Sequence, residues 1–463
     1  MATATASPPS PDPTKIYALI AYEDPYVQPL IVAAVQRCFP PGTIQLITSL
    51  DDVPSKFSRL LQWVQYESID FEHLLSQPSV HLANAYVIRK ALIRKHYLST
   101  TVANWVAKHP ASALVKGWKQ GVEFEVDYAE FLDDALVEAW ELRESWARGE
   151  GGKREWWILK PGMSERGQGI RLFSSEEELT TIFEGWDPES DDEEEDEDED
   201  EDARSDAAGE EEKDVDDGDG IITSQLRHFV AQPYIHPPLL FQNRKFHIRT
   251  YVLATSALRV YVYKPLLALF AARPYSAPSS TAFEDGDAED ALRSHLTNTC
   301  LQDTGEREGS VGLFWDLPDS IPPQPSFSDD EDAIKEFDIP LDATWKSVVF
   351  ARVCSITGEV FEAAARAMSI HFQPLPNAFE IFGLDFMVGR EPDGELRTYL
   401  LEVNAFPDFR QTGDECKGVV EGLMESVVRT AVVPFFDAEK KMEVGDGEDG
   451  GLVKVLDVDL GRR

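Results

Sequence analysis

The chain has 463 residues, 43% of them apolar and 10% aromatic, which is enough for a sizeable core and excludes a wholly disordered protein. Acidic residues outnumber basic ones by 84 to 43, and the formal net charge of −41 argues against a nucleic-acid binder held by phosphate contacts. The longest apolar run, Leu266 to Ala272, is too short to span a bilayer, and the four cysteines have no metal-binding or disulfide spacing. We therefore expect a soluble, cytoplasmic protein with neither a membrane nor a nucleic-acid partner.

The N-terminal part of the chain has the pattern of a small α/β domain. Residues 1–14 are rich in Pro, Ser, Thr and Ala, do not resemble a secretory signal, and are expected to be disordered. A buried strand at 15–22, an amphipathic helix at 30–39 and a second strand at 44–48 follow. This β-α-β order predicts an α/β domain over residues 15–85.

A central domain, residues 86–155, is predicted to be mostly helical, with helical patterns at 82–95 and 128–146. An apolar strand at 156–161 then opens a glycine-rich turn. Between Asp187 and Asp219, 22 acids and two bases form an acidic run. We interpret this run as a disordered insertion, and a docking tail for basic partners is the alternative.

The C-terminal part, residues 156–436, alternates strands and helices and is followed by a charged tail at 437–463. Two segments rich in acidic residues, Ser and Pro, 276–291 and 318–338, look like loop insertions. The predicted strands lie at 229–235, 245–253, 257–264, 380–388 and 398–406, and the predicted helices at 345–368 and 417–433.

One predicted hairpin brings two acidic residues face to face. Asp393-Gly394 is the preferred dipeptide of a two-residue turn, and a turn there pairs Asp385 directly with Glu402. Like charges at paired positions are destabilising unless something binds between them. Asn404 follows on the same face, and two carboxylates with an amide oxygen form a site suited to Mg²⁺.

The aliphatic neighbours Leu401 and Val403 are expected to point the other way, into the core. The alternative is that both acids lie on the solvated face of an ordinary hairpin. The mostly apolar run from Phe386 to Val388 disfavours this alternative, because charges in such strands are rarely buried without a partner.

A row of basic residues forms a second candidate site. Lys245, His247 and Arg249 alternate with apolar residues and Thr250, so they share one face of a strand, as an anionic ligand would require. A solvated outer face is the alternative. Lys264 ends the next strand and is either part of this cationic site or a lysine at the sheet edge.

A glycine-rich loop follows Lys160, which ends an apolar strand. Gly162, Gly167 and Gly169 would let backbone N–H groups approach phosphate oxygens, while the lysine supplies charge. The spacing fits neither a Walker A loop nor a dinucleotide fingerprint, and a plain turn is the alternative. Taken together, the three sites indicate nucleotide phosphates and Mg²⁺.

These motifs resemble those of the tubulin-tyrosine ligase and tubulin-tyrosine-ligase-like family. The segments IRKALIRK, WILKPGMSERGQGI, VAQPYI, KFHIRTYVL, VYVYK, HLTN, GLDFMV and LLEVN occur in the family's order, over about residues 15 to 435. The resemblance implies an α/β (α+β) architecture: an ATP-grasp fold preceded by a small α/β domain and a central mixed domain. It also implies ATP and Mg²⁺ as cofactors.

Roles for individual residues follow from the same resemblance. Residues that look like ATP contacts are Lys90, Lys160, Gln232, Ile235 and Lys245. Those that look like cations around the transferring phosphate and the substrate carboxylate are Arg249 and Lys264. Asp385, Glu402 and Asn404 resemble the magnesium ligands, in agreement with the hairpin pattern.

Two positions depart from the family. His247 replaces the usual acid of KFDIR, at a position that helps to orient the incoming amino acid, and Pro233 replaces a charged residue after Gln232. The resemblance implies a ligase that activates a protein carboxylate as an acyl-phosphate and joins it to a free amino acid (Tyr, Glu or Gly). The acceptor would be a protein, for example the tubulin C-terminal tail. A non-catalytic ATP-binding interaction module is the alternative, and a ligase of small metabolites is a third hypothesis.

Overall fold

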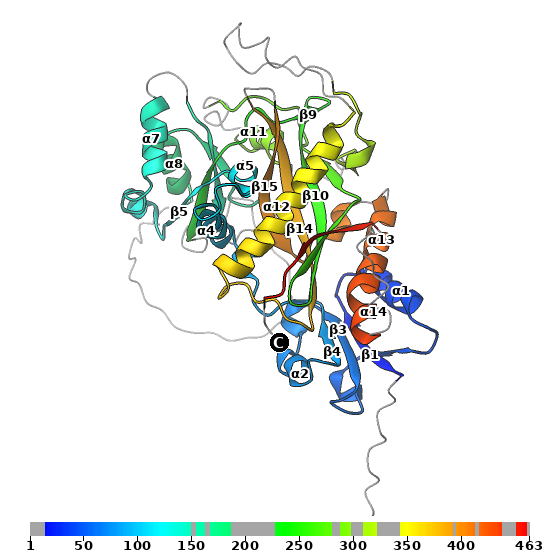
Figure 1. Ribbon diagram of the computed structural model, residues 1–463. Coiled ribbons are helices and arrows are strands. Elements are labelled where there is room, and N and C mark those ends of the chain that lie inside the picture. The colour runs from blue at the N-terminus through cyan, green and yellow to red at the C-terminus, as the bar shows by residue number, and fades with distance from the viewer. Residues whose placement is uncertain are drawn as a thin grey trace, which may run out of the picture. The chain divides into compact units, whose positions relative to one another are not determined.

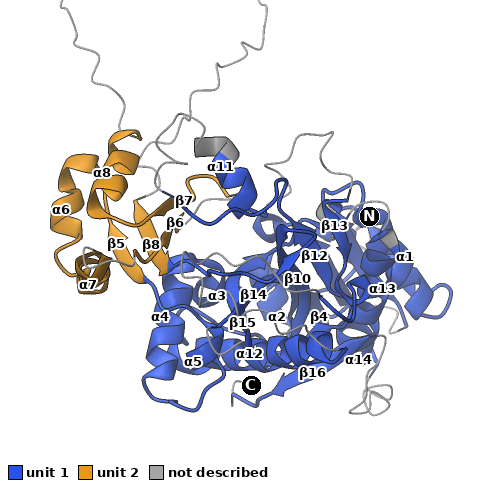
Figure 2. Ribbon diagram, turned by 90° about the horizontal axis from the view of Figure 1, so that it is seen from above, with its two compact units in different colours: residues 1–121, 233–463 blue, residues 122–232 orange. Residues whose placement is uncertain are grey.

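We describe a computed structural model of the chain over residues 14–149, 154–162, 167–186, 227–279, 288–297, 309–321, 343–391, 395–412, 416–437 and 451–460. These residues form two compact units, one made of residues 1–121 and 233–463 and the other of residues 122–232 (Figure 2). The acidic run and most of the leader and of the two loop insertions lie outside the described residues. No helix of the described part is long and apolar enough to cross a membrane.

The first unit begins with a four-stranded parallel sheet of order β2-β1-β3-β4. The predicted β-α-β start is confirmed, because helix α1 (Gln28–Cys38) connects β1 to β2 and buries Ile31, Ala34 and Val35, which are spaced as one helical face. The strands are β1 (Ile16–Ala21), β2 (Ile44–Ile47), β3 (Arg59–Val64) and β4 (His81–Ala83). Helix α2 is Phe71–Ser76.

The helix predicted over residues 82–95 begins later than expected. Its first residues belong to β4, since the Asn84 side chain bonds to both backbone groups of Val64 and extends the pairing with β3. Helical structure starts only at α3 (Lys90–Ile93) and continues as α4 (Lys95–Val106) and α5 (Leu114–Gly117). The apolar spacing in this segment suits both a helix and a strand, and the hydrogen bonds of the Asn84 side chain favour the strand.

An eight-stranded sheet, antiparallel in all its described pairings, forms the centre of the first unit, with the long strand β10 (Arg244–Thr255) in its middle. Strand β14 pairs along one side of β10, and β12 and β11 pair along the other. The strands predicted near 245–253, 257–264, 380–388 and 398–406 are confirmed. The other strands are β9 (Leu240–Phe241), β11 (Arg259–Tyr263), β12 (Leu267–Phe270), β13 (Val311–Leu313), β14 (Phe379–Arg390), β15 (Leu396–Ala405) and β16 (Leu452–Asp457).

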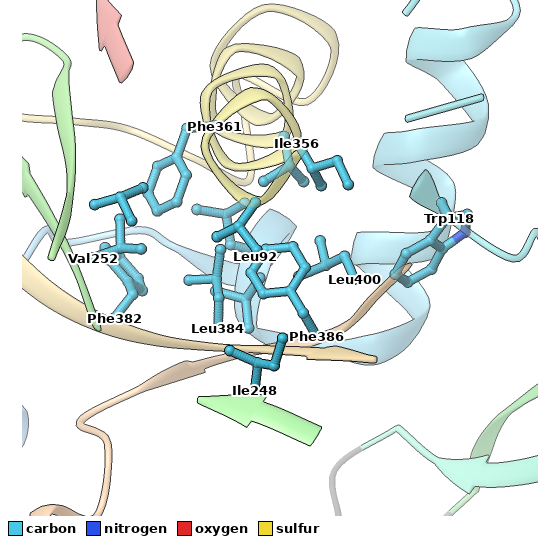
Figure 3. Close-up of a cluster of buried hydrophobic side chains, with 14 of the residues drawn as sticks. Leu92, Trp118, Ile248, Val252, Ile356, Phe361, Phe382, Leu384, Phe386 and Leu400 are labelled. Atoms are coloured by element: carbon cyan, nitrogen blue, oxygen red, sulfur yellow. The ribbon is translucent and has the colours of Figure 1, made fainter. Parts of the chain in front are cut away.

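Helix α12 (Trp345–Ala367) crosses one face of this sheet (Figure 1). Ile356 and Phe361 of α12 point at Phe382 and Phe386 of β14, and all four side chains are buried (Figure 3). Burial of a phenylalanine stabilises the fold by about 1.5–3 kcal/mol, so this layer is a main source of stability.

The opposite face of the sheet packs against the C-terminal helices, and α1 packs in turn on these helices. These helices are α13 (Lys417–Val427), a π-helical segment (Val428–Val432) and α14 (Val433–Phe436), in agreement with the prediction for 417–433. Strand β16 pairs with the outer edge of β11, and its Val455 carbonyl lies against Gly358 of α12. A Cβ at position 358 would be 2.8 Å from that oxygen, so only glycine permits this approach.

The second unit contains a four-stranded sheet of order β5-β8-β6-β7, covered by helices over a core that includes Phe183 and Phe229. The long helix predicted over 128–146 is wrong, because bonds from Val137 to Asp134 and from Ala139 to Leu136 form tight turns in its middle. The elements are β5 (Val122–Glu125), α6 (Leu132–Ala135), α7 (Trp140–Gly149), β6 (Trp157–Pro161), β7 (Arg171–Phe173), α8 (Glu176–Glu184) and β8 (His228–Pro233).

Candidate active site

The β14–β15 hairpin brings Asp385, Glu402 and Asn404 together, as the sequence predicts. Asp385 is paired with Glu402 across the two strands. The Asn404 amide Nδ2 donates to Glu402 Oε1 at 3.1 Å and to Asp385 Oδ2 at 3.4 Å. Asp385 is almost fully buried, whereas the Glu402 side chain is 29% exposed, so solvent reaches the group at Glu402.

The pairing is correct although the predicted two-residue turn is wrong. The Glu391 N–H donates to the Glu395 carbonyl at 3.0 Å. This hydrogen bond closes a loop of three residues, instead of the two that were predicted. A β-bulge beside Asp385, where Leu401 is the extra residue, restores the register. One additional loop residue and one additional strand residue thus cancel, and Asp385 meets Glu402.

The bulge also changes where Leu401 points. Val403 lies in the main core as predicted, but Leu401 packs against Ile235, Met387 and Tyr399, which form a separate small apolar cluster. Met387 lies two residues beyond Asp385 on the same strand face. The structure therefore places an apolar surface that includes Ile235 next to the acidic group.

The basic row of β10 faces the same acidic group. Lys245, His247 and Arg249 are only 3%, 3% and 7% exposed, which excludes the solvated outer face. Arg249 Nε and Nη2 donate to the two oxygens of Asp385 at 2.5 and 3.1 Å. Burial works to lower the pKa of Arg249, but the charge and hydrogen bonds of Asp385 outweigh it and raise that pKa, so the guanidinium stays charged.

His247 lies between Lys245 and Arg249 along β10 and also faces Asp385. Its Nδ1 is 2.5 Å from Thr297 Oγ1, and its Nε2 is 3.6 Å from Asp385 Oδ1. Burial lowers the pKa of His247, and the nearby Arg249 adds to this effect while Asp385 opposes it. The ring is therefore neutral at pH 7, and the carboxylate of Asp385 favours the tautomer with the proton on Nε2.

One lysine of this group was not assigned from the sequence. Lys95 Nζ lies 3.8 Å from Glu402 Oε2, whereas Lys90, the lysine assigned to ATP, is exposed at the start of α3. A signal was present, because the triplet Ile-Arg-Lys occurs twice, ending at Lys90 and at Lys95. Lys264 lies one residue beyond β11, with its carbonyl accepting from Trp315 Nε1 at 2.6 Å, and its assignment stays a prediction.

A buried ion pair supports the start of α3. Arg89 Nε is 2.9 Å from Glu380 Oε1, and the Arg89 guanidinium lies 3.7 Å from the centre of the Tyr66 ring. Glu380 also accepts the Tyr86 N–H at 3.1 Å. Both members of the pair are buried, and the pattern of the sequence did not predict them.

In the second unit, Lys160 and Gln232 meet, although 72 residues separate them in the sequence. Lys160 Nζ donates to Gln232 Oε1 at 2.8 Å, and both side chains are buried on neighbouring strands, β6 and β8. Gly167 and Gly169 have positive φ angles of 82° and 72°, which side chains other than glycine rarely adopt. Residues 163–166 of the glycine-rich loop lie outside the described residues.

The acidic group fits a magnesium ion bound together with phosphate. Among the described residues, no three His, Cys, Asp or Glu side chains gather as metal ligands. Mg²⁺ is, however, usually held by only one or two carboxylates together with substrate phosphates and water. A carboxylate oxygen can accept more than one partner, so Asp385 could bind a cation without losing Arg249.

Comparison with solved structures establishes the class of fold. The chain is similar to the C-terminal domain of Kluyveromyces lactis Pby1, described as an ATP-grasp enzyme interacting with the mRNA decapping enzyme Dcp2. The two share 32% identity and a TM-score of 0.63, over 96% of this chain and 99% of that domain. The predicted ATP-grasp architecture is thereby confirmed.

Sequence comparison establishes the family. The model of the tubulin-tyrosine ligase family matches residues 77–440, and the chain belongs to this family. A probable tubulin–tyrosine ligase of Schizosaccharomyces pombe is 42% identical over 93% of this chain and 94% of its own length. The probable tubulin–tyrosine ligase PBY1 of Saccharomyces cerevisiae is 39% identical over 93% of this chain, which spans only 54% of that relative.

Proposed function

We propose that the protein is an ATP- and Mg²⁺-dependent amino-acid ligase that joins a free amino acid to a protein carboxylate through an acyl-phosphate. The observation that carries this proposal is the convergence of Asp385, Glu402 and Asn404 with Arg249 and Lys95. Paired acids and buried cations in one group serve little purpose in a stable core, since each charge costs free energy to bury. They are suited to an anionic ligand that arrives with a divalent cation.

The proposed roles follow from charge and position. Asp385, Glu402 and Asn404 would hold Mg²⁺, which would neutralise phosphate oxygens so that a carboxylate can approach. Lys245 and Lys95 would add positive charge beside the phosphates, and the apolar surface at Ile235 would take the adenine ring. The assignments of Lys90, Lys160 and Gln232 to the nucleotide stay part of the proposal.

Arg249 is the proposed contact of the acceptor carboxylate and of the charge that develops on it. Its planar guanidinium can bind a carboxylate with two parallel hydrogen bonds. His247, neutral, would offer an uncharged ring where the family acid offers a negatively charged acceptor. We therefore expect amino-acid selection to differ from that of relatives with an acid at this position. We further propose a cytoplasmic location and a protein acceptor, with the tubulin tail as the first to test.

The test is ADP release by the purified chain with Mg-ATP, across Tyr, Glu and Gly, with and without tubulin. Release that requires one amino acid and an acceptor would support the ligase and identify its donor. Glu402→Gln should abolish release, because it removes one anion of the acidic group. The control is Glu395→Gln on the same hairpin, whose carboxylate pairs with the half-buried Arg352 instead. Equal loss in both variants would contradict the assignment of Glu402.

A second candidate is an ATP-binding protein-interaction module of the same fold. The K. lactis relative of known structure is described as interacting with Dcp2, and His247 alters the amino-acid site. Under this hypothesis the chain binds a Dcp2 protein and releases no ADP with any amino acid. Binding assays with a Dcp2 protein, with and without Mg-ATP, separate the two candidates when they are run beside the ADP assay.

A further inference from the structure

A short segment of the second unit, Tyr128 to Glu141, exposes several large apolar side chains. Tyr128, Phe131, Val137 and Trp140 are 53%, 47%, 60% and 58% exposed. They are four of the ten large apolar residues that are exposed in the described part of the chain, although all four lie between residues 128 and 140. Single exposed apolar residues are normal, whereas a group of them marks an interaction site.

The core of the second unit does not account for these four side chains. The segment includes α6 and the start of α7, which lie next to each other (Figure 2), and one helical face of it packs into the core. The residues on this buried face are Leu132, Leu136, Ala139 and Leu142. Tyr128 and Phe131 instead pack edge to face against each other, with ring centres 6.2 Å apart. Since the core is filled by other residues, the stability of the fold does not require apolar side chains at these outward positions.

Acidic residues are interspersed with the exposed apolar ones. The segment contains no base and five acids, which are Glu130, Asp133, Asp134, Glu138 and Glu141. The ion pairs recorded between described residues of this unit involve other acids: Arg148 pairs with Glu155, and Arg227 pairs with Glu125 and Asp127. The segment therefore presents apolar groups in a negatively charged setting.

This charge decides which occupant fits the surface. Every segment of more than four residues outside the described ones has more acids than bases, so the chain's own segments would be repelled. A second copy is disfavoured for the same reason, because the whole chain has a formal charge of −41. Residues 128–140 span about 18 Å at a helical rise of about 1.5 Å per residue, which is the length of about five or six residues of extended peptide.

We propose that the segment Tyr128 to Glu141 is a docking surface for a basic segment of a partner protein, in which Lys or Arg alternates with large apolar residues. The apolar side chains of the partner would cover Phe131 and Trp140, and its cations would meet the neighbouring acids. The surface contains none of the residues assigned to nucleotide or metal, so the inference does not depend on the proposed ligase function. It also differs from docking on the acidic run, whose only large apolar residue is Val215.

The test measures the binding of two labelled peptides to the full chain by fluorescence anisotropy. In the first peptide Lys and Arg alternate with Leu and Trp, and in the second Ser replaces Leu and Trp at the same charge. We expect wild type to bind the first peptide about tenfold more tightly or better, because only this peptide can cover the exposed apolar side chains. The acidic run would attract both peptides alike.

Substitutions then locate the binding site. Trp140→Ser and Phe131→Ser should each weaken the first peptide by about tenfold and leave the second unchanged. Glu130→Gln combined with Glu138→Gln should weaken both peptides by about two- to tenfold. The matched control is Phe57→Ser, because Phe57 is as exposed as Trp140, at 58%, but belongs to the first unit, so neither affinity should change.

Three results would overturn the proposal. The first is equal binding of the two peptides by wild type, or no binding of the first peptide. The second is a loss of affinity in Phe57→Ser as large as that in Trp140→Ser. The third comes from sedimentation velocity: a wild-type dimer that dissociates in Trp140→Ser would assign the surface to a second copy, whereas a monomer is the expected result.

Discussion

Replacement of Gly383 by alanine tests whether the packing around Arg249 is as tight as the structure indicates. Gly383 pairs with Asn404, and a Cβ there would lie 2.9 Å from Pro407 Cβ and 3.5 Å from Arg249 Cδ. Carbon atoms prefer separations of at least about 3.5 Å, so the proline must move by about 0.6 Å. The rigid ring of Pro407 cannot rotate away, and the preceding Phe406 already has a positive φ of 51°.

We expect Gly383→Ala to lower the free energy of unfolding by about 1–3 kcal/mol, the usual cost of overpacking. The measurement is urea unfolding followed by tryptophan fluorescence. Gly418→Ala on α13 is the control, because nothing lies within 4 Å of the added methyl group. A glycine-to-alanine change at such a site should be neutral or stabilising by about 0.4–1 kcal/mol. If Gly383→Ala unfolds at the same urea concentration as wild type, the argument about Pro407 is wrong.

Three further predictions concern the core, a buried acid and the guanidinium of the site. Phe382→Ala should cost about 3–5 kcal/mol in urea unfolding, since its ring is fully buried under α12, whereas the same change at the 58%-exposed Phe57 should cost less than about 0.5 kcal/mol. Burial, opposed by Arg89, raises the pKa of Glu380 from 4.5 to about 7, so between these values the folded state holds the proton more tightly than the unfolded state. The stability of wild type relative to Glu380→Gln should therefore fall as pH rises through this window, and a constant difference in unfolding free energy would contradict it. Arg249→Lys cannot form the two-pronged contact and should reduce ADP release by about tenfold or more, whereas Arg37→Lys in an exposed ion pair should not change it.

The parts of the site that lie on strands were predictable from sequence alone. Alternation along β10 separated Lys245, His247 and Arg249 from the core residues between them, because side chains of a strand point to opposite faces in turn. The pairing of Asp385 with Glu402 was also predicted, but its success depended on a bulge and a longer loop that cancel. No feature of the sequence pattern indicates either the bulge or the longer loop.

The parts that depend on contacts between distant segments were not predictable. Lys95, on α4, reaches Glu402 on β15, and the pattern of the sequence did not assign this contact between distant segments. The partner of Arg89 lies almost 300 residues away at Glu380, and no periodicity encodes such a pair. Side-chain bonds across the fold decide these positions, and local propensity does not determine them.

The outer strand β16 has a practical consequence for work with the protein. Strand β16 covers one side of β11 and lies beyond residues 438–450, which are not among the described residues. Truncation after Asp437 would remove it and leave a row of backbone N–H and C=O groups on β11 without partners, a template for pairing with other chains. We therefore expect shortened versions of the protein to aggregate on expression, and purification tags to be safer at the N-terminus.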